Sequence, residues 1–148
     1  MMSTLMHPQV LCSAVELVIN QALSLNLHGR EHLKPLEQKT LTVQLAEVNF
    51  PLSFTINEKQ VLVTILTERS DCTISTSVST LKKLKANQQI TQLIKQGELD
   101  VIGDVKIAQQ FAAIAQSLEI DWQSELAKHI GDVPTHKILQ FGNKITKT

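Results

Sequence analysis

The sequence predicts an α+β domain, and three patterns indicate it. Apolar residues recur at helical spacing from Pro8 to Leu27. Short segments of alternating apolar and polar residues, typical of strands, follow one another between Thr40 and Ser77. A last short strand ends at Gly103-Asp104 and leads into a helix that has no charged residue from Ile107 to Leu118. The rest of the chain is organised around this last stretch.

Length and composition fit one domain with an aliphatic core. A chain of 148 residues buries roughly 68–70% of its unfolded surface. Hydrophobic residues make up 43%, but aromatic residues only 3% and Tyr is absent, so Leu, Ile, Val and Ala must fill the interior. We expect a single domain over residues 1–148, with a helix over 8–27, a connection over 28–39 and the sheet with its helices over 40–145.

Charge and cysteine content exclude several classes of protein. The 14 basic and 14 acidic residues cancel, which argues against a nucleic-acid partner because phosphate binding needs a basic face. Cys12 and Cys72 have no metal-type spacing, which favours a reduced, cytoplasmic setting. The first 29 residues contain no Lys or Arg, whereas a secretory signal begins with a positively charged segment, so we expect no such signal. No run of about 18 apolar residues exists, so we expect no transmembrane segment.

The first helix has an unusually wide apolar surface, with Glu16 as its only charge. Such a surface suits a helix that contacts more than one partner: its own domain, a second subunit or a membrane surface. Membrane-surface helices normally carry Lys and Arg, and this one has none. Packing within the domain is therefore favoured.

The connection that follows holds His28 and His32, four residues apart. That spacing would place two metal ligands on one helical face, but Gly29 lies between them and no further ligands follow. We interpret this segment as a solvated connection.

Four strands are expected next, and the third is unusual. Their ranges are Thr40–Leu45, Phe50–Ile56, Gln60–Thr67 and Cys72–Ser77. The third has apolar residues on both faces: Val61, Val63 and Ile65 on one, Leu62 and Leu66 on the other. A sheet with one solvent-exposed face does not need apolar residues on both faces. Either something covers the second face or the strand pairs with another molecule.

Helices dominate the second half of the chain. Two short ones are expected over Val78–Leu84 and Gln88–Lys95, and later ones over Trp122–His129 and from Val133-Pro134 to Ile145. Lys82, Lys83 and Lys85 form a basic patch that is usually a solvated face, although it would also suit an acidic partner or anionic headgroups.

The uncharged helix from Ile107 is apolar almost all round. Such a helix is expected to be buried on nearly all sides, either in the core or as a cavity wall. These two interpretations are compatible.

No residue pattern predicts catalysis. The sequence has no Gly-rich phosphate loop and no G-x-S-x-G nucleophile turn. Alternation places Glu98 and Asp100 on the exposed side of a strand, and Asp104 at a helix start. His129 and His136 have no candidate Cys or Ser partner. We therefore predict no catalytic residue, no metal ligand and no cofactor.

A family resemblance is carried by three stretches: Asp71-Cys72-Thr73-Ile74, Leu81–Leu84, and Leu93–Asp104 with Gln110-Phe111. The chain resembles the sterol carrier protein type of lipid-binding domain, in which a G-x-L-x-ϕ-x-G strand leads into a helix beside the lipid tunnel. Gly97, Leu99, Val101 and Gly103 match that strand. The resemblance is strongest to bacterial accessory factors of ubiquinone biosynthesis that have this domain at their N-terminus.

The resemblance implies a five-stranded, mostly antiparallel sheet with helices covering one face and a hydrophobic cavity between sheet and helices. It also implies a non-catalytic carrier of lipids or polyprenyl quinone intermediates that joins the ubiquinone biosynthesis proteins. That family continues into a charged C-terminal coiled-coil region, which this chain is expected to lack.

Nine residues are candidates for the cavity wall, chosen by alternation and helical spacing: Val61, Val63, Ile65, Leu99, Val101, Ala108, Phe111, Ala112 and Ala115. A register slip of one residue would turn each strand's set to the other face. The alternative hypothesis is an interaction module in which the Val10–Leu25 helix and the final helix form a homo- or hetero-oligomer and any cavity is vestigial.

Overall fold

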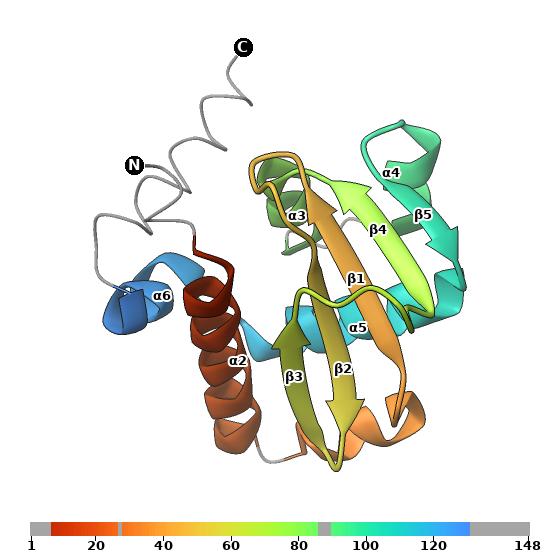
Figure 1. The fold of residues 1–148 in the computed structure, drawn as a ribbon. Helices are drawn as coiled ribbons and strands as arrows, with labels where there is room; N and C mark the ends of the chain where they lie inside the picture. The colour runs from red at the N-terminus through yellow and green to blue at the C-terminus, as the bar shows by residue number, and fades with distance from the viewer. Residues whose placement is uncertain (1–6, 27, 86–89, 131–148) are drawn as a thin grey trace.

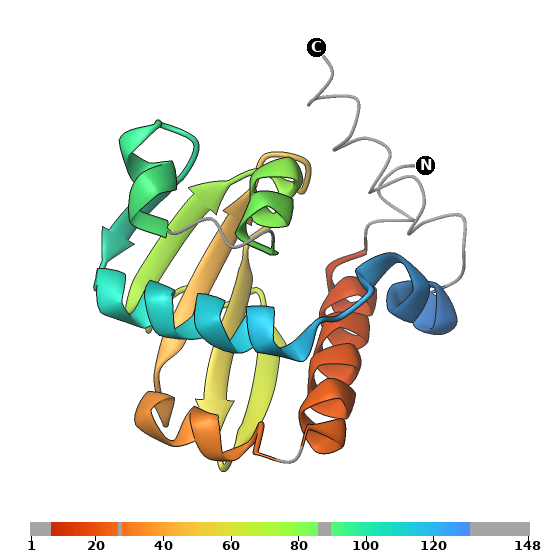
Figure 2. The ribbon, with the colours of Figure 1, turned by 180° about the vertical axis from the view of Figure 1, so that it is seen from behind.

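The computed structural model describes residues 7–26, 28–85 and 90–130, which form one sheet with helices on one face and along one edge (Figures 1 and 2). The elements, in chain order, are α2 (Pro8–Leu25), η1 (Glu31–Leu36), β1 (Thr40–Leu45), β2 (Leu52–Asn57), β3 (Gln60–Thr64), β4 (Cys72–Thr76), α3 (Val78–Lys85), α4 (Ile90–Lys95), β5 (Asp100–Gly103), α5 (Val105–Leu118) and α6 (Trp122–Ile130).

The sheet has five strands in the order β3-β2-β1-β4-β5. Three neighbouring pairs are antiparallel, and the central pair β1–β4 is parallel. The expected α+β fold with a five-stranded, mostly antiparallel sheet is thus confirmed. At the centre, Leu41 lies opposite Phe54 of β2 and opposite Cys72 of β4.

The two faces of the sheet differ in chemistry. The face toward α5 is aliphatic and carries Leu41, Val43, Phe54, Ile56, Val61, Val63, Cys72, Ile74 and Val101. The opposite face carries hydroxyl groups, which pair between β1 and β2: Thr40 with Thr55 at 2.8 Å and Thr42 with Ser53 at 2.9 Å. The connection from β3 to β4 crosses this second face (Figure 1). The expected cover over the second face is therefore the protein's own chain.

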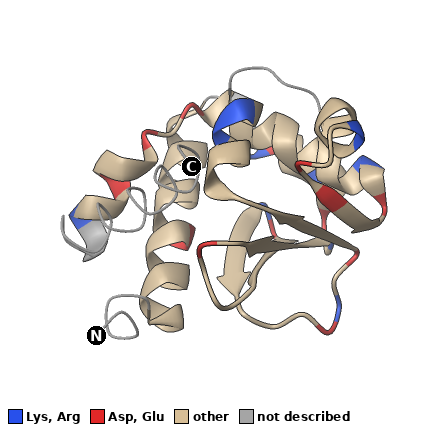
Figure 3. Ribbon diagram, turned by 90° about the horizontal axis from the view of Figure 1, so that it is seen from above, with Lys and Arg blue, Asp and Glu red and all other residues tan. Residues whose placement is uncertain are grey.

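Helix α2 packs within the domain along the edge strand β3. The Asn20 side chain accepts a hydrogen bond from the Val61 N–H at 3.0 Å and donates to the Val61 carbonyl at 2.8 Å. One turn earlier, a Glu16 carboxylate oxygen accepts from the Val63 N–H at 2.8 Å. Glu16 is the only charged residue of α2, which is otherwise tan in Figure 3. Its carboxylate thus satisfies a backbone N–H of the edge strand.

The connection from α2 to β1 is only partly solvated, because two of its leucines are buried in the core. His28 and His32 are exposed, as expected, but Leu33 and Leu36 of η1 are each only 1% exposed. The prediction is wrong in this respect, because the tight turn of η1 places these two leucines, three residues apart, on the same inward side.

Asp71 joins the start of β1, the start of β4 and the end of β5. A carboxylate oxygen of Asp71 accepts from the Thr40 N–H at 2.8 Å, and the Asp71 N–H donates to the Thr40 carbonyl at 2.9 Å. The Asp71 carbonyl accepts from the N–H of Asp104, which caps α5 through the Lys106 N–H at 2.9 Å. Gly103 passes this junction at φ 106°, where a Cβ would lie 2.5 Å from the Asp71 carbonyl oxygen.

Three predicted element ends need correction. Helix α2 ends at Leu25, and Leu27 lies outside the described residues. Strand β2 begins at Leu52 instead of Phe50. Strand β3 ends at Thr64, so Ile65 and Leu66 belong to the connection, because the chain must leave this edge to cross the sheet toward β4.

The prediction that the uncharged helix is buried on nearly all sides is wrong. Only Ile107 and Ala108 of α5 are buried, whereas Ala113 and Ala115 are exposed. The helix lies across one face of the sheet with its other side toward solvent (Figure 2). A methyl side chain exposes little apolar area, so outward alanines cost little free energy.

Helix α3 makes polar contacts at both of its ends and along its exposed side. The Val78 N–H of α3 donates to Glu47 at 3.0 Å, and Gln116 of α5 donates to the Leu84 carbonyl at 2.6 Å. Lys83, from the predicted basic patch, pairs with Glu98.

Among the described residues, no helix is long and apolar enough to cross a membrane. The predicted helix over 133–145 and the start of the one from Gln88 lie outside the described residues.

We expect Gly103→Ala to lower the free energy of unfolding by at least about 3 kcal/mol, since it adds a backbone clash to the strain of a positive φ. Gly97→Ala is the matched control, because Gly97 has φ 75° but no atom within 4 Å of an added Cβ. It should lose only about 1 kcal/mol. Urea unfolding of both variants measures the difference, and equal losses would contradict the packing against Asp71.

Asn20→Ala should lower the free energy of unfolding by about 2–3 kcal/mol, because it leaves the Val61 N–H and carbonyl without partners. Gln21→Ala changes an exposed residue on the same helix and should stay within about 0.5 kcal/mol of the wild type. Urea unfolding again provides the measurement, and a neutral Asn20→Ala would show that α2 does not stabilise the edge.

Candidate functional site

The candidate site is the apolar layer between the sheet and α5. On the sheet side, Phe54 in β2 and Val101 in β5 are only partly buried, although both lie on the face toward the helices. On the helix side, Phe111, Ile114 and Leu118 are also partly buried and pack against the core. The helices therefore leave part of the aliphatic sheet face accessible.

The structure places the nine predicted wall residues in three groups. Val61, Val63, Leu99 and Ala108 are buried in the core cluster. Val101, Phe111 and Ala112 are half-buried and pack against that cluster. Ile65 and Ala115 are exposed, the first beyond the end of β3 and the second on the outer side of α5. The role of these residues as a cavity lining stays a prediction.

Sequence reasoning identified only one residue, Phe111, of the main inward stripe of α5. That stripe is Ile107, Phe111, Ile114 and Leu118, spaced by four, three and four residues. Helical periodicity was the available signal, but alanines around the whole helix hid which side faced the sheet. Phe54 was also missed, although the alternation along β2 places its side chain on the other face of the sheet from those of its neighbours Ser53 and Thr55.

The two free cysteines, Cys12 and Cys72, are both buried. Cys72 faces α5, and burial raises the pKa of its thiol, while a hydrogen bond from the Ala108 N–H opposes this rise. Burial and the nearby Glu16 carboxylate likewise raise the pKa of the Cys12 thiol. Both thiols are therefore poor nucleophiles at neutral pH, because the thiolate is the reactive form.

The other predicted polar positions have structural partners or are solvated. Glu98 pairs with Lys83, Asp104 caps α5 and Asp100 is exposed. Over the described residues there is no group of three or more His, Cys, Asp or Glu side chains that could hold a metal ion.

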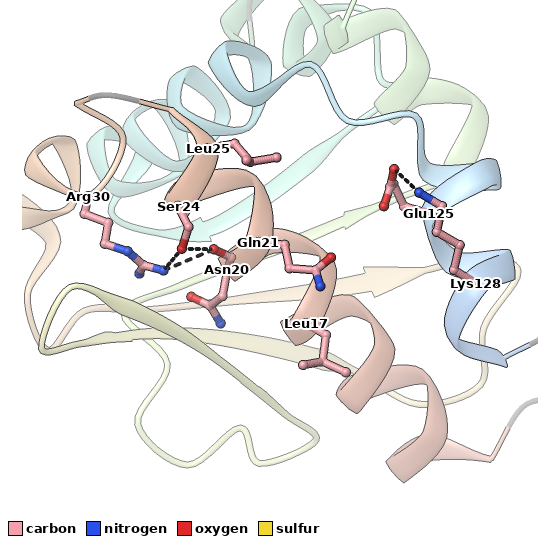
Figure 4. Close-up of a pocket in the computed structure, with 8 residues that line it drawn as sticks. All are labelled: Leu17, Asn20, Gln21, Ser24, Leu25, Arg30, Glu125 and Lys128. Carbon is pink, nitrogen blue, oxygen red and sulfur yellow. Dashed lines mark hydrogen bonds and ion pairs between the residues drawn. The ribbon is translucent and has the colours of Figure 1, made fainter.

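A separate groove of about 560 Å³ lies between α2 and α6 (Figure 4). Leu17, Gln21 and Leu25 of α2 line one side, and Glu125 and Lys128 of α6 line the other. Several of its polar side chains already have partners: Lys128 pairs with Glu125 at 3.1 Å, and Arg30 donates to the Ser24 hydroxyl at 2.7 Å. The groove is open to solvent.

Comparison with known proteins shows the family of the chain. Residues 19–116, from the middle of α2 to the last turn of α5, match the SCP-2 sterol transfer family. The chain belongs to this family. Sterol Carrier Protein 2 from Yarrowia lipolytica shares the fold at a TM-score of 0.50 and 16% identity, covering 74% of this chain and 94% of that protein.

Closer similarity is found to one bacterial branch. The chain is 39% identical to the ubiquinone biosynthesis accessory factor UbiJ of Salmonella typhimurium over 104 residues, which are 70% of this chain and 52% of that protein. UbiJ of Escherichia coli is 37% identical over 103 residues, 68% of this chain and 50% of the relative. The chain thus spans about half the length of these curated relatives.

A solved UbiJ-SCP2 ubiquinone synthesis protein gives the matching structural comparison. Its TM-score is 0.69 at 31% identity, and the match covers 78% of this chain and 96% of that one. The expected family resemblance is confirmed.

Proposed function

We propose that this protein is a non-catalytic accessory factor of ubiquinone biosynthesis. In this proposal it holds polyprenylated quinone intermediates in the apolar layer and presents them to the biosynthetic enzymes. The similarity to the UbiJ proteins supports the pathway. The observation that carries the lipid-holding role is the set of partly exposed apolar residues on both sides of the layer, among them Phe54 on the sheet and Phe111 and Ile114 on α5.

The physical chemistry of the ligand agrees with this role. A polyprenyl chain is nearly insoluble, and burying each CH₂ group is worth about 0.8 kcal/mol. The face of the sheet toward α5 is lined by aliphatic and aromatic side chains and a protonated thiol, with no charged group among the strand residues that form it. Such a surface binds a hydrocarbon tail without any catalytic group.

Native mass spectrometry with solvent extraction tests the lipid-holding role directly. The purified protein should retain a co-purifying lipid or take up an added polyprenylphenol. A protein that does neither would contradict the proposal.

Ala112→Trp should abolish uptake of the polyprenylphenol while leaving the fold intact, because the indole ring would fill space beside the half-buried Phe111. Ala113→Trp is the matched control, since the next residue along α5 is exposed. Fluorescence or mass-spectrometric uptake measures binding, and circular dichroism checks the fold. Unchanged uptake by Ala112→Trp would show that the ligand does not contact this side of α5.

One observation favours the second candidate function, an interaction module. Three large apolar side chains lie exposed along α2, whose one charged residue, Glu16, binds the backbone of β3: Val10 at 46%, Leu17 at 49% and Leu25 at 88% exposure. An apolar stripe of this kind is typical of a protein contact.

Light scattering over a range of protein concentrations separates the two functions. The interaction module predicts a mass that rises with concentration toward a dimer or larger assembly. A lipid-loaded monomer whose mass does not depend on concentration would contradict it.

A further inference from the structure

A polar cluster lies where the N-terminus of α3 meets the β1–β2 connection. We call Glu47, Ser77, Ser79 and Thr80 the α3 cluster. The Val78 N–H donates to Glu47 Oε1 at 3.0 Å, and the Thr80 N–H donates to the Ser77 hydroxyl at 3.2 Å. The Ser77 hydroxyl also contacts the hydroxyls of Ser79 at 2.9 Å and Thr80 at 3.1 Å. The cluster thus caps the helix internally.

Glu47 has one carboxylate oxygen that the cluster does not use. Only 9% of the residue is exposed, and its Oε2 is the one enclosed side-chain oxygen or nitrogen in the described part of the chain that has no hydrogen-bond partner. Burying an acceptor without a donor is unfavourable, so such groups in folded proteins usually serve a partner.

The turn that carries Glu47 lies at one end of the apolar layer. Val48, directly after Glu47, is buried in the core cluster, and Leu45, directly before Ala46, packs against it. Helix α3 covers the same end of the sheet on the α5 side (Figure 2), with Leu84 buried and Leu81 partly buried. A tail in the apolar layer would therefore bring its head group toward the α3 cluster.

The chemistry of the α3 cluster selects a donor, not an anion. A helix N-terminus attracts anions through its free N–H groups, but here Glu47 and Ser77 already accept from Val78 and Thr80. What remains available is a carboxylate oxygen, which accepts hydrogen bonds strongly.

We propose that Glu47 Oε2 accepts a hydrogen bond from a hydroxyl group on the ring of the bound amphiphile. The ligand class is then a prenylated phenol, and a ring with only carbonyl or ether oxygens is disfavoured because it would face the carboxylate with acceptors alone. This inference rests on the proposed function and adds to it the orientation of the ligand and a preference for phenols over quinones.

The test compares 2-geranylphenol with its methyl ether, in which a methyl group replaces the hydroxyl hydrogen and removes the hydrogen-bond donor. We expect the wild-type protein to bind the phenol about tenfold more tightly, the gain of one hydrogen bond to a charged group. In Glu47→Gln the amide oxygen still accepts from Val78, but an NH₂ group replaces Oε2. Because both probe oxygens accept from NH₂, this variant should lose the preference.

Glu98→Gln is the matched control, since it neutralises another carboxylate beside α3, the partner of Lys83, and should keep the tenfold preference. Equal binding of both probes to the wild type would overturn the role of Glu47 and leave the lipid-holding function standing, with Oε2 served by water only. Binding of neither probe would overturn both proposals. A preference retained in a folded Glu47→Gln would also overturn the role of Glu47.

Discussion

The junction at Asp71 is the constraint on which the arrangement of this domain depends. Asp71 binds the backbone at the start of β1, directly precedes β4 and accepts a hydrogen bond from the N–H of Asp104, the cap of α5. Its carbonyl also leaves space only for a glycine at the end of β5. Because Asp104 caps α5 immediately after Gly103, the helix must start at this corner and run across the sheet toward α2. The direction of α5 is therefore fixed at its first turn.

A helix fixed at one end covers a five-stranded sheet incompletely. The first turn of α5 is buried through Ile107 and Ala108, whereas Phe111 and Leu118 farther along are only partly buried. The polar contact of Gln116 with α3 then holds the other end without sealing the layer. A buried first turn followed by a less tightly packed continuation is what the proposed lipid-holding role requires.

Local patterns predicted the elements well but not the contacts between distant segments. The alternation in Thr40–Leu45 and the Gly103-Asp104 turn specified strands and a helix start, because these signals act over a few residues. The role of Glu16 could not be predicted, since its partner Val63 lies 47 positions away. The outward alanines of α5 misled for a different reason: alanine is compatible with burial and with exposure, so its presence does not define a face.

The edge contacts of α2 also bear on how this protein can assemble. Residues four apart on a helix are separated by about 6 Å, and residues two apart on a strand by about 6.7 Å, so Glu16 and Asn20 match the backbone groups of β3 as a sixth strand would. An incoming peptide therefore cannot extend the sheet at β3. Extension is left to the four-residue strand β5, whose exposed Asp100 opposes flat stacking into fibrils.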